Sequence, residues 1–171
     1  MGAPKVAILM GSNSDVRAMC GAAEILDEFK VPYSFRILSA HRTPNAAAEF
    51  AENAHNEFDV IICGAGMAAH LAGAVAAKTH LPVIGVPLSG SSLNGFDALY
   101  ATVQMPAGMP VATVAIDNAA NAGILAVQIL ALYHPSIKEK FKKFRDGQTE
   151  KTVQKDRQLE EIGWRKWLET H

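Results

Sequence analysis

Val6-Ala7-Ile8-Leu9-Met10 runs directly into Gly11-Ser12-Asn13-Ser14-Asp15, and this junction indicates how the rest of the chain is built. An unbroken apolar run of this length is typical of a strand that is covered on both faces. The glycine and the polar residues after it mark a turn. From Asp15 to Lys30, apolar residues then recur at helical spacing. The junction therefore predicts a buried strand, a short polar loop and a helix, which is the repeating unit of a parallel α/β sheet.

The same alternation of strand and helix patterns continues along the chain. Apolar runs of strand length occupy Lys5 to Met10, Ser34 to Leu38, Asp59 to Cys63, Pro82 to Val86 and Val111 to Ile116. Helical spacing fills Asp15 to Lys30, Pro44 to His55, Ala68 to His80 and Asn118 to Tyr133. We therefore predict a three-layer, doubly wound α/β fold of flavodoxin-like type. Residues 1–134 are expected to form the α/β catalytic domain and residues 135–171 a C-terminal helical extension.

Composition fits an ordinary globular protein. The 171 residues are 49% hydrophobic and 19% charged, and a formal net charge of −1 predicts no nucleic-acid or membrane surface. The range from Val60 to Phe96 contains no Asp or Glu, which indicates burial in the core or against other subunits. Cys20 and Cys63 lie in apolar surroundings and are interpreted as reduced thiols. With no bilayer-length apolar run and no secretory signal pattern, we expect a cytoplasmic protein.

The C-terminal extension has a different pattern. His134-Pro135 interrupts the chain, and Ile137, Phe141 and Phe144 then mark a helix with one apolar stripe. Beyond Gly147 the segment is charged, yet it contains two tryptophans, Trp164 and Trp167. Large aromatic rings are costly to leave in water. We expect them to pack against a neighbouring subunit, with docking on the chain's own core as the alternative.

Ser39-Ala40-His41-Arg42-Thr43-Pro44 lies where the second strand turns into the second helix. Thr43 is predicted to cap that helix and Pro44 to begin it. Open α/β sheets bind ligands at the carboxyl ends of their strands. An imidazole changes charge near neutral pH, so His41 is a candidate for proton transfer. Arg42 is a candidate clamp for a phosphate or carboxylate. The alternative is that both are ordinary loop residues.

Two further loops lie at the same predicted sheet edge. After the first strand, Ser12 and Ser14 place hydroxyls beside helix N–H groups, and Asp15 would suit ribose hydroxyls. The alternative is that Ser14 or Asp15 merely caps the helix. After the third strand, Gly64-Ala65-Gly66-Met67-Ala68-Ala69-His70 resembles a dinucleotide-binding pattern but lacks the acidic residue about 20 positions on. Its small residues would instead let a flat ligand approach the backbone. His70 alone is more often a capped or core histidine than a catalyst.

The two remaining loops are expected to border the site without contributing catalytic groups. Residues 87–95 are rich in Gly and Ser and are interpreted as a mobile lid or a plain surface loop. Residues 105–110 form a Pro-rich apolar turn that would border the same site. No cluster of His, Cys, Asp and Glu has the spacing of a metal site, so no metal is expected. The loops together predict a site for a small phosphorylated molecule with one acid/base group.

Four motifs in this order resemble the PurE family of purine biosynthesis. They are Met-Gly-Ser-Asn-Ser-Asp at 10–15, Ser-Ala-His-Arg-Thr-Pro at 39–44, Gly-Ala-Gly-Met-Ala-Ala-His-Leu at 64–71 and Val-Gln-Met-Pro at 103–106. The second and fourth are similar to the class that acts as N5-carboxyaminoimidazole ribonucleotide mutase. The resemblance implies an isomerase without metal, ATP, biotin or other cofactor, assembled as a homo-octamer.

The resemblance also implies roles for individual residues. Ser12 and Asp15 match nucleotide-binding positions, Ser39 and Arg42 match the phosphate side, and His41 matches the general acid/base. The positions expected to line the imidazole and the moving carboxylate are Gly64, Ala65, Gly66, Ala69, His70 and Leu71.

The chain departs from the family pattern at two positions. Met67 stands where the family usually has Gly, and Ala72 stands where it usually has Pro. If position 67 requires a positive φ, methionine costs about 1 kcal/mol or more there. Two other functions remain open at this point: a carboxylase that uses free CO2, and a nucleotide-binding sensor without catalysis.

Overall fold

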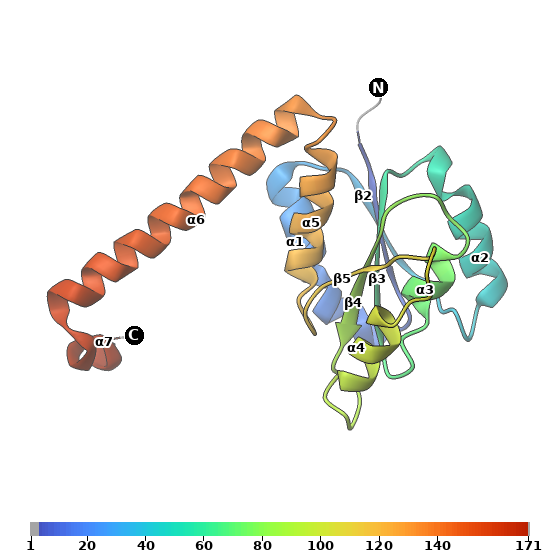
Figure 1. Cartoon of the computed structure of the whole chain (residues 1–171), viewed down its shortest axis with the longest axis horizontal. Helices are drawn as coiled ribbons and strands as arrows, with labels where there is room; N and C mark the ends of the chain where they lie inside the picture. Colours follow the sequence, from blue (N-terminus) through green and yellow to red (C-terminus); the bar gives the residue numbers. More distant parts are fainter. Residues whose placement is uncertain (1–3, 171) are drawn as a thin grey trace.

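The computed structural model describes residues 4–170, in which a single parallel sheet forms the centre (Figure 1). The sheet order is β2-β1-β3-β4-β5, the flavodoxin-like order, so the predicted fold is confirmed. The strands are β1 (Val6–Met10), β2 (Tyr33–Ile37), β3 (Val60–Gly66), β4 (Val83–Leu88) and β5 (Ala112–Thr113). The chain reverses its direction across the sheet between β1 and β3, which makes the carboxyl ends of these strands the expected ligand-binding edge.

Helices cover both faces of the sheet (Figure 1). One face packs against α1 (Val16–Phe29) and α5 (Ala119–Leu130), and the other against α2 (Pro44–Asn53) and α3 (Leu71–Ala76). Residues of β1 alternate between the two cores: Ile8 faces α1 and α5, whereas Leu9 faces α2 and α3. Burial on both sides explains why β1 is apolar at every position. Two short 3-10 helices, η1 (Asn13–Asp15) and η2 (Ala54–Asn56), complete the loops.

Glycines permit two close approaches in the core on the α1/α5 face. A Cβ atom on Gly123 of α5 would lie 2.9 Å from the Ala22 carbonyl oxygen of α1. A Cβ atom on Gly64 of β3 would lie 2.2 Å from the sulfur of Met19. Both distances are far inside van der Waals contact. The absence of a side chain at Gly123 and Gly64 therefore allows α5 to pack closely on α1, and α1 closely on the sheet.

Three elements of the structure differ from the sequence prediction. The helix expected over 68–80 is confined to α3, because residues 64–70 form a strand end and a turn instead. The strand expected over 111–116 is reduced to β5, a two-residue edge strand. An additional helix, α4 (Phe96–Val103), follows β4 and was not predicted; it is only 8 residues long and begins after Gly95 at φ 83°.

The C-terminal extension is a long arm (Figure 1). It consists of α6 (Pro135–Ile162) and α7 (Trp164–Thr170), and α6 alone, with 28 residues, is roughly 42 Å long. Its first turns pack on the body, where the Phe144 ring lies 5.4 Å from the Phe29 ring. Gly147 does not interrupt the helix, and the distal half projects away from the sheet. Trp164 near the tip is 62% exposed. The arm therefore does not fold back onto the core.

No helix within residues 4–170 has the length and apolar character required to cross a bilayer.

Candidate active site

The loops that follow β1, β2 and β3 meet at the carboxyl edge of the sheet. The Gly11 amide donates to the Gly64 carbonyl at 3.2 Å, and the Leu38 amide donates to the Met10 carbonyl at 2.9 Å. The Arg42 guanidinium donates through Nη2 to the Gly11 carbonyl. These bonds tie the three loops into one surface, as the order of the strands requires.

The first loop is closed by Ser12. Its Oγ accepts from the Ser14 amide at 3.3 Å and lies 3.0 Å from Ser14 Oγ, so Ser12 is the N-cap of η1. Asp15 Oδ1 lies 3.1 Å from Ser14 Oγ. Asp15 occupies the N-cap position of α1 but makes no capping hydrogen bond. The capping alternative named Ser14 or Asp15, but the hydroxyl that caps η1 is that of Ser12. The half-buried Asp15 has the cap position of α1 without using its carboxylate there.

The second loop is closed by a pair of residues four positions apart. Thr43 Oγ1 accepts from the Ser39 amide at 2.9 Å and donates to the Ser39 carbonyl at 3.0 Å. Ser39 Oγ in turn accepts from the Arg42 amide at 3.1 Å. Thr43 is the N-cap residue of α2, as predicted, but its side chain makes no capping hydrogen bond, because the hydroxyl is used inside the loop. Pro44 begins α2 as predicted.

His41 and Arg42 occupy the exposed crest of this closed loop. Arg42 Nε lies 3.4 Å from Ser39 Oγ while its Nη2 reaches Gly11, so the guanidinium spans two loops. The His41 ring lies 5.6 Å from the His70 ring in an edge-to-face arrangement. The structure thus brings together two imidazoles from residues 29 positions apart in the sequence (41 to 70), and Arg42 follows His41 on the same loop.

The third loop continues the sheet before it turns. β3 stays in register with β4 as far as Gly66, opposite Leu88, and a Cβ atom on Gly66 would lie 3.2 Å from the Leu88 carbonyl oxygen. Met67 then takes φ 56°, and the Ala69 amide donates to the Met67 carbonyl at 2.9 Å. His70 occupies the N-cap position of α3 and makes no side-chain capping hydrogen bond. His70 is exposed, so the alternative that it is a core histidine is wrong.

The predicted lining residues of this loop divide into two groups. Ala65 and Gly66 are half-buried and His70 is exposed, so these three border the open edge. Ala69 and Leu71 are each only 2% exposed. They support the loop from beneath in this structure, as does the buried Gly64.

The fourth loop is anchored by two aspartates that sequence analysis did not single out. Asp117 Oδ1 accepts from the Ser89 amide at 2.9 Å, and Asp97 Oδ1 accepts from Ser91 Oγ at 2.9 Å. A Cβ atom on Gly66 would lie 3.8 Å from the Gly90 amide, so this loop borders the third one. Asp117 follows the apolar segment 111–116 at the same sheet edge, which was the available signal in the sequence, whereas Asp97 follows the Gly- and Ser-rich loop and had no such signal. A lid function for residues 87–95 stays a prediction.

The candidate site is an open surface in the single chain. His41, Arg42, Met67 and His70 are all exposed. A cavity of about 670 Å³ lies elsewhere, at the amino end of β4 between residues 76–83 and 108–112. Another, of about 430 Å³, lies between α1 and α6 beside Phe29 and Lys140. Neither includes a predicted site residue.

Comparison with known proteins gives consistent matches along most of the chain. The model of the AIR carboxylase family matches residues 5–151. The N5-carboxyaminoimidazole ribonucleotide mutase of Thermotoga maritima is 53% identical over 166 residues, covering 96% of this chain and 97% of that protein. The mutase of Pyrococcus abyssi is 52% identical over 170 residues, covering 99% and 98%.

A longer relative and a solved structure match as well. The phosphoribosylaminoimidazole carboxylase of Schizosaccharomyces pombe is 54% identical over 165 residues, which cover 96% of this chain but 30% of that protein. The crystal structure of Treponema denticola PurE superposes with a TM-score of 0.83 at 31% identity, covering 91% of this chain and 98% of that one.

Proposed function

The chain belongs to the AIR carboxylase family, and from that membership we propose that it is an N5-carboxyaminoimidazole ribonucleotide mutase. It moves the carboxylate of that substrate from nitrogen to ring carbon 4, giving 4-carboxy-5-aminoimidazole ribonucleotide, as a cytoplasmic step of de novo purine biosynthesis. The observation that carries this proposal is the pairing of the His41 and His70 rings at the carboxyl edge of the sheet, on a loop whose Arg42 also reaches Gly11 of the first loop. One anion-binding group and one proton-transfer group side by side are what this substrate needs.

The phosphate is held by the first two loops. Arg42 presents a delocalised cation there. Ser12 and Ser39 each present a hydroxyl, the first within its loop beside the Ser14 amide and the second beside the Arg42 amide. Charge-assisted hydrogen bonds to phosphate are roughly twice as strong as neutral ones. Asp15 accepts hydrogen bonds from the ribose hydroxyls. The imidazole then lies toward the third loop, near Ala65, Gly66 and His70.

The reaction keeps its protons in balance. When the carbamate N–C bond breaks, its electron pair returns to nitrogen, which takes up one proton, and CO2 is released. Ring carbon 4 then attacks CO2 through the enamine electrons, and its own proton leaves to restore aromaticity. One proton enters and one departs, so a single acid/base group is sufficient, and we assign this role to His41. The carbamate already carries the carbon to be transferred, so no external energy source is needed.

Retaining CO2 requires an enclosed site, which the single chain lacks. We propose that assembly supplies the enclosure. Phe96, Tyr100 and Val103 form an exposed apolar stripe along α4, next to the site, and the tip of the arm carries Trp164. Exposed apolar surfaces of this kind mark interfaces. Residues 1–134 then act as the catalytic domain and residues 135–171 as contacts within a homo-octamer.

The proposed reaction is tested by mixing the protein with synthetic N5-carboxyaminoimidazole ribonucleotide, without ATP, and following product absorbance. We expect turnover that does not depend on added bicarbonate. In the His41→Asn variant turnover should fall by about 10²-fold or more, while nucleotide affinity and circular dichroism stay unchanged. Tight binding without turnover by the wild-type protein would support a sensor instead. Turnover of aminoimidazole ribonucleotide only with added bicarbonate would support a carboxylase.

A further inference from the structure

Met67 has an unusual backbone conformation. Within residues 4–170, positive φ values at residues other than glycine occur at Lys30, Met67, Asn94 and Asp117. Asn and Asp tolerate this region because their short side chains bond locally. Lys30 ends α1 in the left-handed conformation that is common at helix ends. Met67, at φ 56°, has neither explanation.

Packing within the chain does not offset this strain. The Met67 side chain is 64% exposed, so most of its apolar surface faces outward. The turn around it is built by backbone contacts: the Ala69 amide donates to the Met67 carbonyl, and Gly66 lies against the Leu88 carbonyl. A glycine would make the same turn without strain. A strained, exposed apolar residue at a candidate active site indicates a functional contact.

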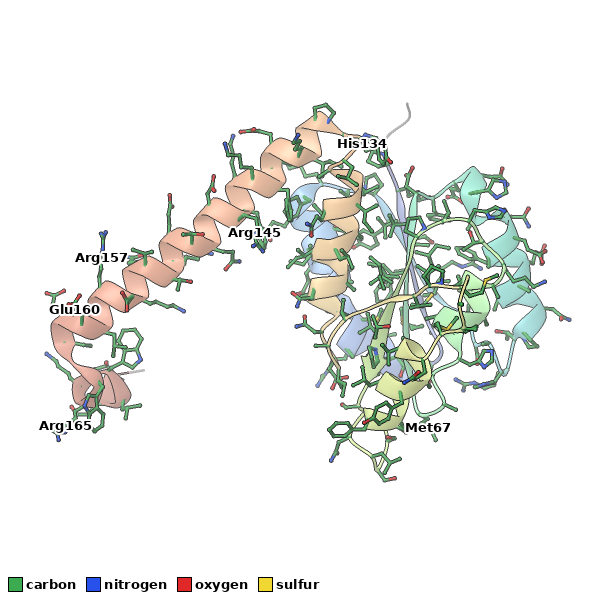
Figure 2. The ribbon with its side chains drawn as sticks, viewed as in Figure 1. Met67, His134, Arg145, Arg157, Glu160 and Arg165 are labelled. Atoms are coloured by element: carbon green, nitrogen blue, oxygen red, sulfur yellow. The ribbon has the colours of Figure 1, made fainter. Side chains whose placement is uncertain are left out.

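The position of Met67 suggests what it contacts. It follows β3 at the carboxyl edge of the sheet and precedes by three positions His70, whose ring lies 5.6 Å from that of His41. Figure 2 shows Met67 at the end of the body where α4 lies. Its neighbour Gly66 borders the fourth loop at Gly90. The flexible thioether side chain of Met67 can therefore extend over a ligand bound between the third and fourth loops.

We propose that Met67 is the apolar cover of the reacting carboxylate, which excludes water and holds CO2 against ring carbon 4. This inference rests on the proposed function and adds to it a residue that sets how often CO2 is retained. Methionine adapts its shape to an apolar or weakly polar surface without offering hydrogen bonds. Exclusion of water prevents the released CO2 and the amine from separating before recombination.

The test uses substrate labelled with ¹³C in the carbamate. It measures the amounts of carboxylated product and of released aminoimidazole ribonucleotide. The wild-type protein should place nearly all label in the ring carboxylate. Met67→Gly should raise the ratio of released aminoimidazole ribonucleotide to carboxylated product by about tenfold or more, since the variant loses a whole apolar side chain at the site. Its melting temperature should stay equal or rise by up to about 4 °C, because the backbone strain is removed. Met67→Leu, which keeps the apolar bulk, should stay close to wild type in this ratio.

Lys30→Gly is the matched control, because Lys30 has the same φ of 56° and ends α1 away from the site loops. It should relieve backbone strain likewise and leave the product ratio unchanged. An unchanged ratio in Met67→Gly, with normal conversion by wild type, would overturn the inference alone. A ratio that rises only together with a smaller particle mass in light scattering would also overturn it, since Met67 would then be an interface residue. Failure of wild type to convert the substrate would overturn the proposed function and this inference with it.

Discussion

Arg42→Ala should weaken phosphate binding while leaving the fold intact. In the structure its guanidinium donates to the Gly11 carbonyl and lies 3.4 Å from Ser39 Oγ, but the side chain is exposed, so the folded state depends little on it. A hydrogen bond to a charged group contributes about 1.5–3 kcal/mol. With one such bond to phosphate, partly screened by water, we expect a loss of about 2 kcal/mol, or roughly 30-fold in Kd.

The assay is a cycle of two proteins and two ligands, measured by titration calorimetry. Wild type should lose affinity on removal of the 5′-phosphate, and Arg42→Ala should lose little further. Arg36→Ala is the control, because Arg36 lies on the preceding strand with its guanidinium 5.3 Å from the centre of the Phe50 ring. It should bind both ligands as wild type does. Equal losses on removal of the phosphate from wild type and Arg42→Ala would refute the assignment of Arg42 to the phosphate.

Three further predictions concern assembly, chemistry and packing. Deletion of the residues after Lys155 should leave circular dichroism of the body intact but give a smaller or less stable particle in light scattering; an unchanged particle would contradict the interface role of the arm. Burial raises the pKa of the Cys63 thiol, so its alkylation in the folded protein at pH 8 should be far slower than in urea, and equal rates would show that the core opens freely. Gly123→Ala should lower the free energy of unfolding by about 1–3 kcal/mol, because its Cβ atom meets the Ala22 carbonyl. The control Gly147→Ala, in an open part of α6, should be neutral or stabilising, and a similar loss there would refute the packing argument.

The sheet was predictable because burial on both faces leaves a signal in every residue of a strand. β1, β3 and β4 are apolar almost throughout, and each is fully buried over most of its length. Edge elements lack that signal. β5 pairs over only two residues, and the apolar stripe of α4 faces outward, so neither pattern points to the core.

The sequence predicted which residues form the site better than it predicted their conformations and hydrogen bonds. Parallel strands place the loops at 11–15, 39–43 and 64–70 at one edge, so His41 and His70 had to lie near each other. The sequence could not distinguish Thr43 as a cap from Thr43 as a loop closure, since one hydroxyl serves either use. The conformation of Met67 also depends on the pairing of Gly66 with Leu88, which only the folded sheet defines.

Gly147 suggests a helix end near the middle of α6, yet the helix continues through it to Ile162. Gly147 weakens a helix by roughly 1 kcal/mol relative to alanine. The surrounding residues are good helix formers, and Lys143 lies 3.7 Å from Glu139 one turn before it. These preferences together carry the helix through the glycine, as Figure 2 shows along the arm past Arg145 and Arg157.

Transfer of the carboxylate within the site is tested most directly by the fate of its carbon. The wild-type protein should be given substrate labelled with ¹³C in the carbamate, in buffer with excess unlabelled bicarbonate, and the product analysed by mass spectrometry at early times. We predict that the ring carboxylate keeps nearly all of the label whatever the bicarbonate concentration. Dilution of the label toward that of the bulk bicarbonate would contradict the account, because the carbon would then come from CO2 in solution.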